Sequence, residues 1–314
     1  MTTPWPTESG RFALGDVQTL SGETLPGAAV TWKTHGRLNA ARDNVVLYPT
    51  SYGAQHTDLE WLIGPDGVLD PTRWFIVIPD MFGNGLSSSP SNTPAYPQLV
   101  TAWDNVHAQQ AYHWAAAFPD AVARIVVNCG SARTSVHNQV FLKSLMATLE
   151  AAPEHRGNGR FSASPRAALR AFGRIYAGWA LSQDFYRADL HRTALKAPDL
   201  ETFLRTDWED RFTARNADNV YAQLRCWEAG DISANPLYNR DLPAALRAIR
   251  ARVLLMPGAT DLYFRVADNE AELPFLRDAR LQPIPSIWGH RAGNPMQNPE
   301  DVAFVKAQVR GWLD

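Results

Sequence analysis

The chain has few cysteines, which excludes two kinds of structural framework. Its 314 residues include two cysteines, Cys129 and Cys226, and neither belongs to a Cys-x-x-Cys pair. Disulfide frameworks and zinc knuckles both need several closely spaced cysteines. We therefore expect both thiols to be reduced and to lie in the core.

Long runs of one charge and long apolar runs are also missing. The 30 Lys and Arg residues nearly balance the 32 Asp and Glu residues, for a formal net charge of −2. Nothing in this balance attracts a nucleic acid or an anionic membrane. No apolar run is long enough to span a bilayer, and residues 1–10 lack an apolar signal segment. We expect a cytoplasmic protein that acts on a small molecule, without a nucleic-acid or membrane partner.

The patterns that are present predict an α/β fold. Unbroken apolar runs are typical of strands buried on both faces, as in a parallel sheet. An antiparallel hairpin precedes them, and a run without Gly or Pro at 101–118 predicts one helix. The predicted strands are 12–20, 28–34, 44–48, 74–78, 124–129, 252–256 and 281–288, and a final helix at 299–313 is expected to cover one face of the sheet.

The segment between residues 135 and 240 contains no comparable strand. It has helix-like stretches at 140–150, 165–180 and 217–228 instead. A helical cap inserted into a sheet domain explains this interruption. We assign residues 1–134 and 241–314 to the α/β core and residues 135–240 to the cap.

His290 and Asp261 are the candidate base and orienting acid. His290 follows a short apolar run in a Gly-rich turn, and Asp261 follows the strand at 252–256. Adjacent parallel strands share one rim at their carboxyl ends, so the two side chains could meet there. For either residue alone, a turn or loop role is as good an interpretation. Together and in this order they favour catalysis.

Several moderately specific segments occur in the order of a known family. They are Thr-His-Gly-Arg-Leu-Asn at 34–39 with Asn44, Trp-Leu-Ile-Gly-Pro at 61–65 with Leu69 and Asp70, the run at 75–79, residues 123–138, Asp261, and Gly289-His290. With them the chain resembles the α/β-hydrolase fold, in particular the homoserine O-acetyltransferase family and its hydrolase-like relatives. The resemblance covers nearly the whole chain.

This resemblance implies a mostly parallel sheet with an inserted helical cap, and acyl transfer or ester hydrolysis through a Ser-His-Asp triad. Asp261 and His290 would be its acid and base. The loop at 50–56 matches the position of one oxyanion-hole amide, so the N–H of Ser51 or Tyr52 is expected to stabilise the oxyanion. From the sequence alone, a plain turn after a strand explains this loop equally well.

The serine nucleophile is the part of this pattern that the chain lacks. The fold presents it in a Gly-x-Ser-x-Gly turn, and no such motif occurs. Residues 104–109 resemble the helix before the nucleophile strand, and residues 110–115 resemble the helix after the turn. Roughly two dozen residues, including one central strand, are therefore missing between Gln109 and Gln110. The neighbours of that strand must pair with each other or leave backbone groups unsatisfied.

Few side chains could replace the serine. Ser131 follows the strand at 124–129 on the same rim and is the best candidate, although a serine that caps the next segment is more frequent. The serines at 87–89 lie in a flexible connection, and the apolar strand before Cys129 raises the pKa of its thiol. Two hypotheses follow: an acyltransferase or esterase with a displaced nucleophile, or an inactive deletion or splice product that acts at most as a binding or interaction module.

The remaining sequence motifs bear on which metals, cofactors or substrates the protein could bind. His107 and His113 are six residues apart, which does not suit a metal pair on one helix face, and Gly83 to Gly85 lack a dinucleotide motif. We expect neither metal nor cofactor; an acyl-CoA would be a substrate. The run at 81–87 departs from the family pattern, which leaves hydrolysis open beside transfer. Tryptophans of the cap could line a pocket, but core packing is the more frequent role. The substrate is expected to be a small acyl compound. Assembly into a homodimer is left as an open alternative.

Overall fold

A computed structural model describes residues 4–107 and 111–314, and its strands form two sheets. The first sheet has the order β1-β2-β4-β3. β1 (Thr7–Gln18) and β2 (Thr24–His35) form an antiparallel pair, and β2 pairs in the same sense with β4 (Phe75–Pro79). β3 (Val45–Leu47) runs parallel to β4 at the edge. The predicted hairpin and the two strands after it are confirmed.

The second sheet consists of β5 (Arg124–Asn128), β6 (Arg252–Met256) and β7 (Ala279–Leu281), all parallel. Within residues 4–107 and 111–314, no ladder joins β3 to β5. The expected α/β sheet is thus divided into two hydrogen-bonded parts. The division lies between strands on either side of the Gln109–Gln110 junction, and residues 108–110 themselves lie outside the described part of the chain.

Two predicted elements are wrong in part. Residues 102 and 103 form a turn rather than the start of a helix, and the 3-10 helix η2 (Asp104–His107) follows it before helix α1 (Ala111–Ala117). Asp104 accepts the N–H and the hydroxyl of Thr101, which favours this turn over helix. Of the run at 281–288, only Leu281 belongs to a strand. Prolines at 283 and 285 have no N–H to donate to a ladder.

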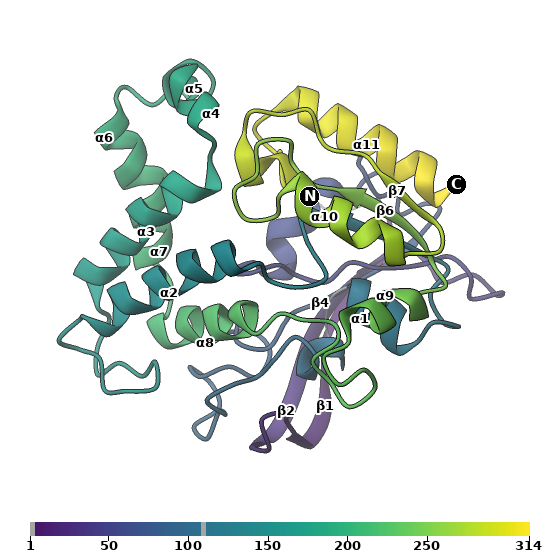
Figure 1. Ribbon diagram of the computed structural model, residues 1–314, viewed down its shortest axis with the longest axis horizontal. Coiled ribbons are helices and arrows are strands. Elements are labelled where there is room, and N and C mark those ends of the chain that lie inside the picture. Colours follow the sequence, from purple (N-terminus) through teal and green to yellow (C-terminus); the bar gives the residue numbers. More distant parts are fainter. Residues whose placement is uncertain (1–3, 108–110) are drawn as a thin grey trace.

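Helices fill the segment between β5 and β6, and most of them form the layer on the left of Figure 1. The helices predicted within 140–150, 165–180 and 217–228 are confirmed. A large aromatic core holds this layer together. The elements are α2 (Val136–Glu150), α3 (Arg166–Ala180), α4 (Gln183–Arg187), α5 (Leu190–Thr193), α6 (Leu200–Phe203), the π-helical η3 (Leu204–Glu209), α7 (Asp210–Thr213), α8 (Ala217–Glu228) and α9 (Leu242–Ala248).

One apolar cluster, called here the shared core, packs both sheets together. It also includes the C-terminal helix, which lies along the sheets as predicted (Figure 1). Its buried members include Ile76 and Ile78 of β4, Leu254 and Met256 of β6, and Val305, Val309 and Trp312 of α11. The remaining elements are η1 (His56–Leu62), α10 (Val266–Glu272), η4 (Leu273–Phe275), η5 (Gly289–Gly293) and α11 (Pro299–Leu313).

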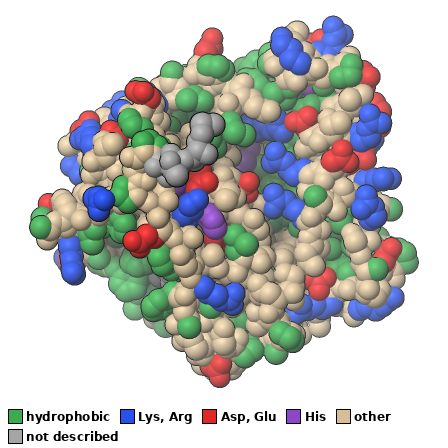
Figure 2. Space-filling view, turned by 180° about the vertical axis from the view of Figure 1, so that it is seen from behind, with side chains coloured by type: hydrophobic (Ala, Val, Ile, Leu, Met, Phe, Trp, Pro, Cys, Tyr) green, Lys and Arg blue, Asp and Glu red, His purple; other side chains and the backbone are tan. Residues whose placement is uncertain are grey.

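The face of the molecule in Figure 2 shows no single dominant charge. Acidic and basic side chains are interspersed over the face in Figure 2, in keeping with the formal net charge of −2. Among the described helices, none is both long and apolar enough to cross a membrane.

Candidate active site

The site is organised around a hydrogen-bonded pair of side chains, Asp261 and His290. His290 Nδ1 lies 2.7 Å from Asp261 Oδ2. The carboxylate is fully buried, while the imidazole is 32% exposed. A carboxylate at Nδ1 favours the tautomer that carries its proton there, which leaves Nε2 free to accept a proton. The expected meeting of the two side chains is confirmed, and their catalytic role stays a prediction.

The loop after β6 fixes the acid. Asp261 Oδ1 accepts the backbone N–H groups of Tyr263 at 2.8 Å and Phe264 at 3.3 Å. These bonds form the turn that the sequence suggested, and they leave Oδ2 for the imidazole. The turn and the orienting role are therefore two functions of one side chain.

Contacts between the loops after β6 and β7 fix the base. Thr260 Oγ1 donates to Ser286 O at 2.9 Å and accepts from Gly289 N at 3.1 Å. Gly289 has φ +61°, and a Cβ atom there would lie 2.8 Å from Ala180 O and from Ser182 N. Only glycine combines this backbone conformation with such a close approach to the cap.

Aromatic and basic side chains surround the imidazole. The rings of Tyr263 and Phe264 lie 4.8 and 5.6 Å from the His290 ring, centre to centre. The guanidinium of Arg291 lies 4.7 Å from the ring centre of Trp208, which ties η5 to the cap. Burial lowers the pKa of Arg291 to about 10, and it stays a cation at neutral pH.

The loop after β3 holds the two candidate oxyanion donors. Within the described part of the chain, the backbone N–H groups of Ser51 and Tyr52 donate to no protein acceptor. The loop is anchored on both sides of them, because Thr50 Oγ1 accepts from Met81 N and Gly53 N donates to Gln223 Oε1, both at 3.0 Å. Both amides can thus bind a developing oxyanion, and this role stays a prediction.

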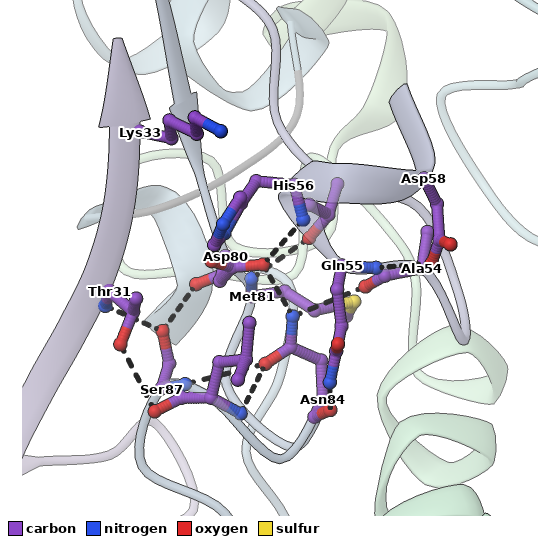
Figure 3. A network of polar contacts seen from close by, with 12 residues as sticks. Thr31, Lys33, Ala54, Gln55, His56, Asp58, Asp80, Met81, Asn84 and Ser87 are labelled. Carbon is purple, nitrogen blue, oxygen red and sulfur yellow. Dashed lines mark hydrogen bonds and ion pairs between the residues drawn. The ribbon is translucent and has the colours of Figure 1, made fainter. Parts of the chain in front are cut away.

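A buried carboxylate after β4 stabilises the same loop (Figure 3). The Asp80 carboxylate accepts hydrogen bonds from the backbone N–H of His56 at 2.9 Å and from the His56 ring nitrogen Nδ1 at 2.6 Å. It also accepts one from Asn84 Nδ2 at 2.8 Å. Asn84 also donates to Ala54 O at 3.2 Å. Neither the His56–Asp80 pair nor its support of the loop was predicted from the sequence. The available signal was position, since His56 lies in the loop after one predicted strand and Asp80 follows the next predicted strand.

The structure does not bring the best substitute nucleophile to the base. Ser131 Oγ donates to Arg133 O at 2.8 Å, and it makes no contact with His290 among the described residues. Ser135 rather than Ser131 caps the next helix. The serines at 87–89 are fully buried and bonded within their loop and to β2, so they are structural.

The thiol of Cys129 also lies beside the pair. It is in hydrogen-bonding contact with Asp261 and accepts the N–H of Gly258, and burial raises its pKa well above the usual range. The thiol contacts the acid rather than donating to the base, so it is poorly placed as a nucleophile. Cys129 directly follows β5, and its φ of +47° distinguishes it from the residues of that strand. The sequence predicted Cys129 as a core residue at the end of a buried strand, and it did not predict the contact with Asp261.

Other predicted features are structural. His113 is buried in α1, where burial lowers its pKa to about 4, and the side chain of His107 lies outside the described part of the chain. Trp208 is buried in the cap core, and Trp179 and Trp227 pack against that core. The interpretation of these tryptophans as packing residues is favoured over a pocket.

Comparison with known proteins gives relatives that cover most of the chain. No family model matches it. The chain is 28% identical to a probable esterase of Corynebacterium glutamicum, over 88% of each protein. It is 28% identical to an ethyl acetate hydrolase of Pseudomonas veronii, over 88% of this chain and 87% of the relative. A homoserine O-acetyltransferase of Leifsonia xyli is 26% identical, over 91% and 86%.

Solved structures agree in fold. The acetyl esterase MekB superposes with a TM-score of 0.92 at 26% identity, over 98% of this chain and 96% of that structure. The chain thus has the α/β-hydrolase fold. Homoserine O-acetyltransferase from Bacillus anthracis has the same fold, with a TM-score of 0.79 at 18% identity and 98% coverage of both chains. The relatives are thus esterases and homoserine O-acyltransferases, as the sequence resemblance predicted.

Proposed function

We propose that this protein hydrolyses small carboxylic esters, with His290 as general base and Asp261 as its orienting acid. An acyltransferase or ester hydrolase is what the relatives support as a class. The observation that carries the proposal for this chain is the 2.7 Å contact between His290 Nδ1 and Asp261 Oδ2 at the carboxyl rim of the second sheet.

Hydrolysis is favoured over transfer to homoserine. One relative is an ethyl acetate hydrolase, and the acetyl esterase MekB superposes better than the homoserine O-acetyltransferase does. An ester with a short acyl group, such as ethyl acetate, is therefore the proposed substrate. These relatives do not favour the alternative of an inactive binding module.

Water is the proposed nucleophile, because no serine contacts His290 in the described part of the chain. His290 Nε2 takes a proton from water as its oxygen adds to the ester carbonyl carbon. The amides of Ser51 and Tyr52 stabilise the resulting oxyanion. Collapse of this intermediate breaks the ester bond, and His290 returns the proton to the leaving alcohol. No covalent acyl-enzyme forms on this route.

Ethyl acetate hydrolysis by the full chain tests the proposal. The variant His290→Gln should lose activity by about 100-fold or more, since general-base catalysis contributes about that much. His137→Gln is the matched control, because His137 is exposed and its ring lies tilted against Trp179 in the cap. It should keep the activity of the unchanged protein.

Two outcomes would contradict the proposal. Equal rates for both variants would exclude His290 as the base. Absence of ethyl acetate hydrolysis by the unsubstituted protein would favour the inactive binding module. Fluorophosphonate treatment with peptide mapping identifies the nucleophile. No labelled serine is expected. If Ser131 were labelled, that residue and not water would be the nucleophile.

A further inference from the structure

Three side chains with metal-binding atoms converge at the base of the site. Cys129 follows β5, Asp261 lies in the loop after β6, and His290 lies in η5. One sulfur, one oxygen and one nitrogen of these residues all lie within 4.8 Å of one another. Among the residues that the structure describes, no other group of three His, Cys, Asp or Glu side chains meets this condition.

The donor set matches the chemistry of zinc. Zn²⁺ binds thiolate sulfur at about 2.3 Å, and imidazole nitrogen or carboxylate oxygen at about 2.0–2.2 Å, in tetrahedral geometry. Tetrahedral angles then place the ligand atoms roughly 3.3–3.7 Å apart. We propose that Cys129, Asp261 and His290 bind Zn²⁺ as three protein ligands, with the fourth position left to water or a substrate oxygen.

Zinc binding requires only small movements of the ligands, and the side chain that is free to move is that of His290. The Nδ1 to Oδ2 distance of 2.7 Å must lengthen, and the sulfur must approach. Two backbone N–H groups hold the carboxylate of Asp261 through Oδ1, whereas the imidazole of His290 is partly exposed. The metal can thus enter by displacement of the ring while the acid stays in place.

Charge balance favours a divalent cation at this position. Asp261 is fully buried, and a buried charge is costly unless it is paired. On binding, the Cys129 thiol releases its proton to solvent and the imidazole proton moves from Nδ1 to Nε2. One thiolate, one carboxylate and Zn²⁺ then form a site without net charge.

Backbone groups already support the ligands. The N–H of Gly258 points to the sulfur of Cys129, and the N–H groups of Tyr263 and Phe264 bind the second oxygen of Asp261. Outer hydrogen bonds of this kind orient the ligands of a metal and tune its affinity. Because the metal takes Nδ1 and Oδ2, the zinc-bound form no longer contains the Asp261–His290 hydrogen bond.

Direct titration of the untagged full chain with Zn²⁺ tests the site without reference to activity. Isothermal titration calorimetry should show one bound ion per chain. Cys129→Ser should weaken that affinity by about 100-fold or more, since even the loss of an outer hydrogen bond costs 10–100-fold. Cys226→Ser is the matched control, because Cys226 is also buried but lies beside Asn105 and Asp104. It should bind zinc as the unchanged chain does.

Cobalt provides a readout that needs no variant. Co²⁺ added to the unchanged chain should give the intense near-ultraviolet charge-transfer band of a thiolate–cobalt bond, and Zn²⁺ should abolish it by exchange. Absence of this band, absence of zinc binding, or equal affinity in Cys129→Ser and Cys226→Ser would each overturn the proposal. If Cys129→Ser does not fold, the cobalt spectrum decides.

Discussion

Gly289 links the backbone of the cap to the position of the base. It has φ +61°, and main-chain atoms of residues 180 and 182 lie 2.8 Å from the position that its Cβ would take. Gly289→Ala should therefore destabilise the protein, by about 1–3 kcal/mol from the backbone conformation alone, and should displace His290. Urea denaturation measures the first effect. The distance between His290 and Asp261 in a crystal structure of the variant measures the second.

Gly311 provides the control for that substitution. It lies in α11, and a Cβ atom there would meet nothing within 4 Å. Gly311→Ala should stabilise the chain by about 0.5–1 kcal/mol, because alanine is the better helix former. Equal effects at the two positions would show that the close approach at Gly289 does not constrain the site.

The division of the sheet leaves the parallel strands β3 and β5 each at the edge of a sheet. β3 exposes Val45 and Leu47, at 48% and 38% of their surface, on a strand of three residues. β4, its neighbour, pairs on both sides. A strand with one unpaired edge opens more readily than a strand between two others, and opening governs amide exchange.

Hydrogen exchange should therefore differ between neighbouring strands of one sheet. The amides of β3 and β5 should exchange roughly tenfold faster or more than those of β4 and β6. Mass spectrometry of peptides from each strand measures the rates under native conditions. Equal protection of β3 and β4 would mean that the free edge of β3 is covered in solution.

At the scale of the whole molecule, side-chain packing replaces the missing ladder. The shared core contains residues of both sheets and of α11, including Trp312, which is 6% exposed. Trp312 also lies under the guanidinium of Arg252, 4.5 Å from its ring centre, at the start of β6. Packing of this kind can hold the sheets together without hydrogen bonds between them.

Truncation of this tryptophan should weaken the entire fold. Trp312→Ala should cost about 3–5 kcal/mol of unfolding free energy, the range for large aromatic residues in cores. Leu200→Ala is the control, since Leu200 is 47% exposed on α6 and should change stability by less than about 0.5 kcal/mol. Urea unfolding followed by circular dichroism gives both values. A small effect at Trp312 would indicate that the two sheets unfold independently.

The sequence by itself determined the main elements and two residues of the site. The apolar runs of β4, β5 and β6 and the helix α11 lie where their patterns predicted, because burial on one or two faces leaves a periodic signal. Asp261 and His290 meet because parallel strands share a carboxyl rim, a rule of topology that needs no coordinates. The sequence also located the break in the sheet, through the junction of two helix-like segments.

Tertiary structure decided what depends on packing between distant segments. Whether β3 and β5 would pair or separate depended on how the shared core packs between them, and no local pattern encodes that choice. The hydrogen bonds of Asp104 to Thr101 replaced the start of one predicted helix by a turn, and the prolines after β7, which lack a donor, shortened one predicted strand. The contact of Cys129 with Asp261 joins segments more than a hundred residues apart. Sequence periodicity reports which face of an element is buried, whereas the identity of the side chain that lies against it is fixed only when the elements pack.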